Sequence, residues 1–257
     1  MRWIAAVCAM VVGIALTAGG FAGAQTVATI MAAKLMEPNQ KTAEVSTEEL
    51  GKILADGSAT VFDARPHLEW AISHIPGAYN VAPKPGVPMS QYVSDVNEVL
   101  RAVNGSKTAP VVLYCNGPFC GKSKRLGEEL VAAGFTSVRR YQLGAPTWRA
   151  LVGYMETELD GALYAYRNDK TAVFVDARSS EEFKVASIPV AKSIPLAEVK
   201  AAKDDGRLPM EDHNTRIIVF GKDSAQARAV AEAIAKEAFH NVTYFVGIYS
   251  TLRSVIK

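Results

Sequence analysis

Short runs of apolar residues alternate with amphipathic stretches along most of the chain. Six runs rich in β-branched and aromatic residues lie at 60–64, 111–115, 138–141, 172–177, 216–220 and 242–246. Continuous apolar character is typical of strands that are buried on both faces, and helical patterns between the runs supply the cover. The pattern therefore predicts an α/β fold with small, mostly parallel sheets flanked by helices. A capped helix start is predicted at Ser46, three positions before Glu49.

The chain contains an internal repeat. The segment VFDARPHLEWAISHIPGA at 61–78 recurs as VDARSSEEFKVASIPVA at 175–191, and VVLYC at 111–115 corresponds to IIVFG at 217–221. Self-similarity on this scale indicates two copies of one domain. We assign them to residues 43–153 and 154–257, with the connection between them near 151–157.

The N-terminal residues resemble a targeting segment. Arg2 is followed by apolar or small residues over 4–24, and Ala22-Gly23-Ala24 fits a signal-peptidase site before Gln25. We predict a signal peptide at 1–24 and a periplasmic or secreted protein without a stable membrane span after cleavage. The alternative is an uncleaved membrane anchor, because the run is long enough to cross a bilayer. Residues 25–42, which are polar and contain Pro38, are expected to form a poorly ordered linker.

The stretch from Val111 to Leu130 carries the candidate chemistry. An apolar run ends on Cys115, a glycine-rich loop follows, and a helical pattern begins near Lys122. Backbone N–H groups and the positive end of a helix favour the thiolate, which is the reactive form of cysteine. The alternative is an inert, buried cysteine at a strand end. The candidate substrate-binding or anion-binding residues of this loop are Asn116, Gly117, Phe119, Gly121, Lys122 and Ser123.

The mature chain would keep two cysteines, Cys115 and Cys120, since Cys8 leaves with the signal peptide. Two cysteines in one loop are too few for a structural zinc site, so we expect no metal and no cofactor. They fit either one nucleophile with a neighbouring thiol or a redox-sensitive pair, because an exported compartment permits disulfides.

The net charge of the chain and its local cations indicate which kinds of binding partner to expect. A net charge of +2 does not favour a nucleic-acid partner. Local cations surround the cysteine loop and suit a small anionic substrate, although a solvated helix face explains part of them. They are Lys122, Lys124, Arg125, Arg139, Arg140 and Arg149.

Three motifs together resemble the tandem rhodaneses of the sulfurtransferase superfamily. They are DAR-xxx-EW-xxx-HIPGA at 63–78, YCNGPFCGKS at 114–123 and LGAPTW at 143–148. The resemblance implies two rhodanese-like domains. It also implies transfer of a sulfane sulfur through a cysteine persulfide, from an anionic donor such as thiosulfate to a thiol or cyanide-type acceptor. Cys115 stands at the position of the family's nucleophile.

The second copy departs from the family pattern. Gly221 occupies the position of the nucleophilic cysteine, so this copy is expected to be catalytically silent. Asp176 and Arg178 then remain for structural reasons. By the same reasoning Asp63, Arg65, Glu69 and His74 are interpreted as scaffold.

The first copy departs from the family pattern in the length of its cysteine loop. Ser123 lies eight residues after Cys115, whereas the family reaches this helix position after six, so Cys120 remains an alternative nucleophile. We prefer Cys115 because a strand end fixes a side chain most rigidly. The pair also leaves open a thiol redox or persulfide-binding module, or a non-catalytic binding protein.

Two further interpretations of the loop are disfavoured. The longer loop suggests phosphate or arsenate chemistry, but Lys122 is a poorer oxyanion clamp than arginine. The segment NGPFCGKS also resembles a phosphate-binding P-loop, except that Asn116 replaces its first glycine.

Overall fold

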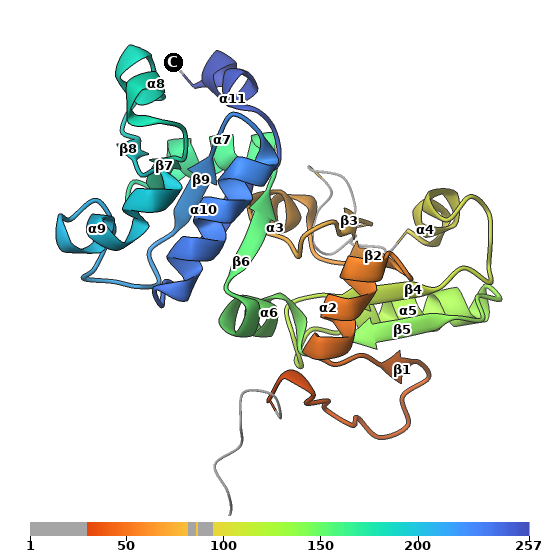
Figure 1. The fold of residues 1–257 in the computed structure, drawn as a ribbon. Helices are drawn as coiled ribbons and strands as arrows, with labels where there is room; N and C mark the ends of the chain where they lie inside the picture. Colours follow the sequence, from red (N-terminus) through yellow and green to blue (C-terminus); the bar gives the residue numbers. More distant parts are fainter. Residues whose placement is uncertain (1–29, 82–85, 87–94, 257) are drawn as a thin grey trace, which may run out of the picture.

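The structure is a computed structural model that describes residues 30–81, 86 and 95–256 (Figure 1). It contains two five-stranded sheets, and every strand pairing within them is parallel. This confirms the predicted α/β fold with two repeated units. Within the described residues, no helix is long and apolar enough to span a membrane. The predicted signal peptide at 1–24 lies outside the described residues.

The first sheet has the strand order β1-β5-β4-β2-β3, which places β4 at its centre. Its strands are β1 (Ala43–Glu44), β2 (Thr60–Asp63), β3 (Tyr79–Asn80), β4 (Val111–Tyr114) and β5 (Val138–Tyr141). Its helices are α2 (Thr47–Asp56), α3 (His67–Ile72), α4 (Val96–Ala102), α5 (Lys122–Ala132) and α6 (Gly144–Val152). Ser46 caps α2 in a reciprocal capping box with Glu49, as the sequence predicts.

The second sheet repeats this order as β6-β10-β9-β7-β8. Its strands are β6 (Tyr154–Thr157), β7 (Val173–Asp176), β8 (Lys192–Ser193), β9 (Ile217–Phe220) and β10 (Val242–Phe245). The helical segments are α7 (Leu159–Asn168), α8 (Ser180–Val185), the 3₁₀ turn η2 (Leu196–Glu198), α9 (Val199–Asp204), α10 (Ser224–Lys236) and α11 (Tyr249–Val255).

Both faces of each sheet are buried. In β4, Val112 and Tyr114 belong to a core shared with α2 and α6, whereas Val111 and Leu113 belong to a core shared with α4 and α5. All four side chains are fully buried. This two-sided burial explains why the strands read as continuous apolar runs.

Residues 30–42 of the segment predicted as a linker make contacts with the first domain, and residues 25–29 lie outside the described residues. The backbone N–H groups of Leu35 and Met36 donate to the Glu44 carboxylate at 2.6 and 2.9 Å. Glu37 forms an ion pair with Lys124 at 2.9 Å, and the Gln142 amide donates to Gln40. The composition of the segment does not predict these contacts, because each partner lies outside the segment and no repeating pattern links the two.

The two domains meet along β6. Residues 151–157, expected to form a connection, contain the end of α6, Gly153 and the whole of this strand. On its outer side β6 is joined to the first domain, since His74 and Glu156 exchange two backbone hydrogen bonds of 2.9 and 2.8 Å. Helix α3 packs against α7, and Figure 1 shows both helices at this junction.

Candidate functional site

The cysteine loop begins at the carboxyl end of β4, the central strand of the first sheet. The N–H of Ala64 donates to the carbonyl of Tyr114 at 2.9 Å, and the N–H of Ala145 donates to that of Cys115 at 2.9 Å. The strand end is therefore anchored on both sides. Parallel α/β sheets bind ligands at this edge, which is where the sequence predicts the site.

Two glycines allow the loop to fold closely over the start of α6. Gly117 and Gly144 have φ values of +97° and +70°, a region that favours glycine. A Cβ atom on Gly144 would lie 2.5 Å from the Cys115 carbonyl oxygen. The Cys120 N–H closes the loop by donating to the Gly117 carbonyl at 3.0 Å. The loop thus returns Cys120 to the vicinity of Cys115.

The Cys115 side chain is buried beneath the loop. Its Sγ lies 3.0 Å from the Cys120 carbonyl oxygen and 3.3 Å from Ser123 Oγ. Interaction with the Cys120 side chain, followed by burial, raises the pKa of Cys115. Just 2% of the Cys115 surface is exposed, and burial disfavours the charged form of the thiol.

Cys120 is half-buried and lies at the N-terminus of α5. No side chain caps this helix, so its first N–H groups are available to a sulfur acceptor. Interaction with the Cys115 side chain lowers the pKa of Cys120 most, followed by the N–H groups of Asn116 and Lys122 and the Lys122 charge. Partial burial opposes this effect, and the resulting pKa is about 5.

The two cysteines lie in different environments. The sequence-based preference for Cys115 rested on rigidity at the strand end, and this assignment stays a prediction. Burial at that position disfavours the charged form of the thiol. The longer loop gives Cys120 the helix terminus and two amide donors.

The remaining loop residues divide into contacts and an exposed tip. Asn116 Nδ2 donates to Glu69 Oε2 at 2.6 Å, which ties the loop to α3. Gly121 is the N-cap residue of α5, and Ser123 is buried against Cys115. Phe119 is fully exposed, so it contributes nothing to the packing of the loop.

Most of the cations around the loop have structural partners. Lys124 and Arg140 both pair with Glu37, Arg125 pairs with Glu129, and Arg149 donates to Ser73 Oγ at 2.9 Å. Lys122 is the cation whose charge lowers the pKa of Cys120. The positive segment is therefore largely part of the fold, as the alternative interpretation of these charges allowed.

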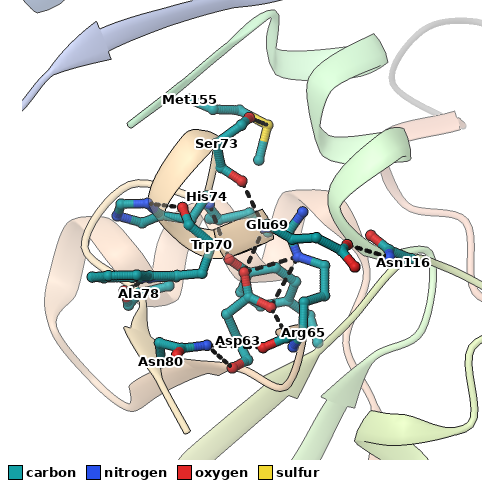
Figure 2. A network of polar contacts seen from close by, with 12 residues as sticks. Asp63, Arg65, Glu69, Trp70, Ser73, His74, Ala78, Asn80, Asn116 and Met155 are labelled. Carbon is teal, nitrogen blue, oxygen red and sulfur yellow. Dashed lines mark hydrogen bonds and ion pairs between the residues drawn. The ribbon is translucent and has the colours of Figure 1, made fainter. Parts of the chain in front are cut away.

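A buried polar network supports the loop from the opposite side (Figure 2). Arg65 donates through Nε and Nη2 to Asp63 and through Nη2 to the Ser73 carbonyl, at distances of 2.5 to 3.0 Å. Asn80 Nδ2 donates to the carbonyls of Asp63 and Arg65. Asp63 and Arg65 form scaffold contacts below the strand end, in agreement with their interpretation from the sequence.

The second domain fills the corresponding position with its own side chains. Gly221 accepts a hydrogen bond from the Tyr249 N–H at 2.9 Å, as Cys115 does from Ala145. Helix α10 starts three residues after Gly221, and Asp223 caps it by accepting from the Gln226 N–H. Gln226 Oε1 accepts from the Lys222 N–H at 2.9 Å and would contact any Cβ on Gly221. At this loop the second domain therefore has the Asp223 carboxylate and the Gln226 amide, whereas the first domain has two thiols.

Some contributors to the site were not identified from the sequence. Leu143 and Gly144 lie against the cysteine loop. They belong to the LGAPTW motif, which drew attention to this segment but did not predict its contact with the loop. Glu69 was interpreted as scaffold, yet its carboxylate accepts a hydrogen bond from Asn116 in the cysteine loop. No pattern pointed to Gln226 as the group that fills the second copy.

The acidity of Cys120 can be measured by alkylation. We expect iodoacetamide to modify Cys120 at a rate that is constant from pH 7 to 9 and falls as the pH drops through about 5, since the thiolate is the reacting form. Peptide mapping by mass spectrometry identifies the modified cysteine, with Cys115 as the internal control. A rate that keeps rising up to about pH 8.5, as for an ordinary thiol, would contradict this assignment.

A family model matches two segments of the chain. The family model described as "Rhodanese-like domain" matches residues 46–151 and 160–251. No curated protein sequence matches the chain.

The similar solved structures are distant. The thiosulfate sulfurtransferase of Pseudomonas aeruginosa is 19% identical, with a TM-score of 0.34, over 79% of this chain and 43% of that one. The 3-mercaptopyruvate sulfotransferase SseA of Escherichia coli is 18% identical, with a TM-score of 0.36, over 82% of this chain and 100% of that one. The chain thus spans less than half of the former. Because the two matched family segments together cover most of the sequence, the protein belongs to the rhodanese-like domain family.

Proposed function

We propose that the protein is a sulfurtransferase that carries a sulfane sulfur on Cys120. The observation that supports this most is the environment of the Cys120 sulfur, which is half-exposed and hydrogen-bonded by the amides of Asn116 and Lys122. Fixed amide donors favour a sulfur anion without having to reorganise during the reaction. Membership of the rhodanese-like family supports the same class of chemistry.

In the first step the Cys120 thiolate attacks the outer sulfur of a donor such as thiosulfate. The bond between the two sulfurs of thiosulfate breaks, sulfite leaves with the bonding electrons, and Cys120 becomes a persulfide anion. The negative charge remains within reach of the loop amides and Lys122. The low pKa of the Cys120 thiol keeps the attacking sulfur ionised at neutral pH.

In the second step a thiophilic acceptor takes the outer sulfur and restores the Cys120 thiolate. With cyanide the product is thiocyanate, and with a thiol the product is a new persulfide. This is two-step covalent catalysis, in which one half-reaction loads the enzyme and the other unloads it. The second domain takes no chemical part, because Gly221 and Gln226 occupy the corresponding position.

Intact-mass spectrometry after incubation with thiosulfate tests this proposal. We expect the Cys115→Ser chain to gain the mass of one sulfur atom, and fragmentation to place that atom on Cys120. The Cys115→Ser background keeps the analysis simple because it leaves one cysteine in the loop. The Cys120→Ser chain is the matched control and should gain nothing. Absence of added sulfur from both chains, each shown to be folded, would contradict the proposed function.

A further inference from the structure

The transfer cycle uses one thiol of the loop and leaves the other unexplained. Cys115 is buried and in contact with Cys120, its Sγ being 3.0 Å from the Cys120 carbonyl oxygen. An inert apolar side chain would fill this place without a polar hydrogen. Instead the position holds a thiol that lies beside the residue that the proposed function modifies.

We propose that Cys115 is a resolving thiol that attacks the Cys120 persulfide, releases hydrosulfide and leaves a Cys115–Cys120 disulfide. The inference rests on the proposed function, since it requires sulfur on Cys120. It adds a second outcome for the bound sulfur. Besides transfer to an acceptor, the sulfur is reduced within the loop and leaves as hydrosulfide.

The step balances without any outside oxidant. Cys115 Sγ forms a bond to Cys120 Sγ, and the bond from Cys120 Sγ to the outer sulfur breaks. The outer sulfur leaves with the electron pair and takes the proton of the Cys115 thiol, so the product is HS⁻. The two cysteines supply two electrons and end as a disulfide, while the sulfane sulfur is reduced.

The surroundings of Cys115 suit this role after Cys120 has been loaded. In the free loop the Cys115 thiol donates to the Cys120 carbonyl oxygen and lies next to the Cys120 side chain. In the persulfide the negative charge lies on the outer sulfur, so that proton has a new acceptor on the group that must leave. Ser123 then remains, with its Oγ at 3.3 Å and its N–H donor, to stabilise charge developing on Cys115.

The loop also carries features that allow the two sulfurs to join. Gly117 has a positive φ, and the Cys120 N–H already bonds to its carbonyl, so the loop turns back on itself between the cysteines. Neither Cys115 nor Cys120 forms a disulfide in the structure, so both thiols are available for the reaction. Because Cys120 is only partly buried, the resulting disulfide is open to a dithiol from solution. The class of partner implied is therefore a dithiol reductant, which would reopen the loop for another cycle.

A single-turnover experiment on the full chain tests the inference. The reduced wild-type chain is freed of small thiols and mixed with thiosulfate under anaerobic conditions without cyanide. We expect one hydrosulfide per chain, then no more, and an intact mass that shows a disulfide in place of two thiols. Addition of dithiothreitol should restore hydrosulfide release. A parallel sample without thiosulfate should keep both thiols, which excludes oxidation by residual air.

The Cys115→Ser chain separates this inference from the proposed function. It should hold the persulfide on Cys120, release no hydrosulfide, and still form thiocyanate when cyanide is added. A wild-type chain that keeps its persulfide, with no hydrosulfide and no disulfide, would overturn the resolving role and leave sulfur transfer intact. Absence of bound sulfur from both chains would overturn the proposed function and this inference with it. The wild-type measurement decides even if the variant fails to fold.

Discussion

Replacing Cys120 by serine is expected to lower the rate of thiocyanate formation from thiosulfate and cyanide by at least about a thousandfold, as for loss of other catalytic nucleophiles. A serine hydroxyl stays protonated at neutral pH and forms no persulfide. The amide donors at the start of α5 remain, but they have no sulfur anion to stabilise. Steady-state kinetics of thiocyanate release, with the variant's folding checked by circular dichroism, measures the effect.

The Cys115→Ser chain is the matched control for this assay. It loses a thiol that donates to Cys120, but serine keeps a hydroxyl donor at the same place. A hydrogen bond to a charged group contributes about 1.5–3 kcal/mol, and serine preserves part of it, so a loss of no more than about tenfold is expected. The reverse order, with Cys115→Ser inactive and Cys120→Ser active, would return the nucleophile to the strand end.

Replacing Arg65 by methionine is expected to reduce the free energy of unfolding by about 3–5 kcal/mol, the usual effect of breaking a buried ion pair on one side. Asp63 is fully buried, and Arg65 supplies the guanidinium that neutralises it. Methionine is similar in length but carries no charge, so the carboxylate keeps only neutral partners, the N–H of residue 65 and the Tyr114 hydroxyl. Urea denaturation followed by tryptophan fluorescence suits this test, because Trp70 and Trp148 both lie in the first domain.

The second domain provides a matched control in Arg178→Met. Asp176 forms the same pair with Arg178 but also accepts a hydrogen bond from Ser187 Oγ at 2.7 Å. Its carboxylate therefore keeps a side-chain donor, and we expect a loss of stability no larger than that of Arg65→Met, measured by far-ultraviolet circular dichroism. Adding Asp63→Asn to Arg65→Met should recover part of the stability by removing the buried charge. A loss below about 1 kcal/mol for Arg65→Met would show that the pair behaves like an exposed one.

Much of the fold could be predicted from the sequence because its signals are local and repeated. The apolar runs at 111–115 and 217–221 mark central strands, and both are buried on two faces. The repeated aspartate and arginine pairs occupy equivalent buried positions at Asp63 and Asp176. Those features depend on periodicity and on matched spacing, which a single sequence displays.

The choice between the two thiols could not be made in this way. It depends on where a six-residue loop places Cys120 relative to the first turn of α5, and two glycines with positive φ determine that path. The attachment of residues 30–42 depends on long-range partners such as Glu37 and Lys124. Such contacts follow from the folded arrangement and leave no local pattern.

The pairing of His74 with Glu156 has a consequence for the two copies. An unpaired edge strand readily recruits other chains, and proteins commonly protect such edges. Here the first copy shields the outer border of β6, which belongs to its sister. Separating the copies would leave the outer edge of β6 without this partner. The second copy therefore depends on the first to cover part of its sheet.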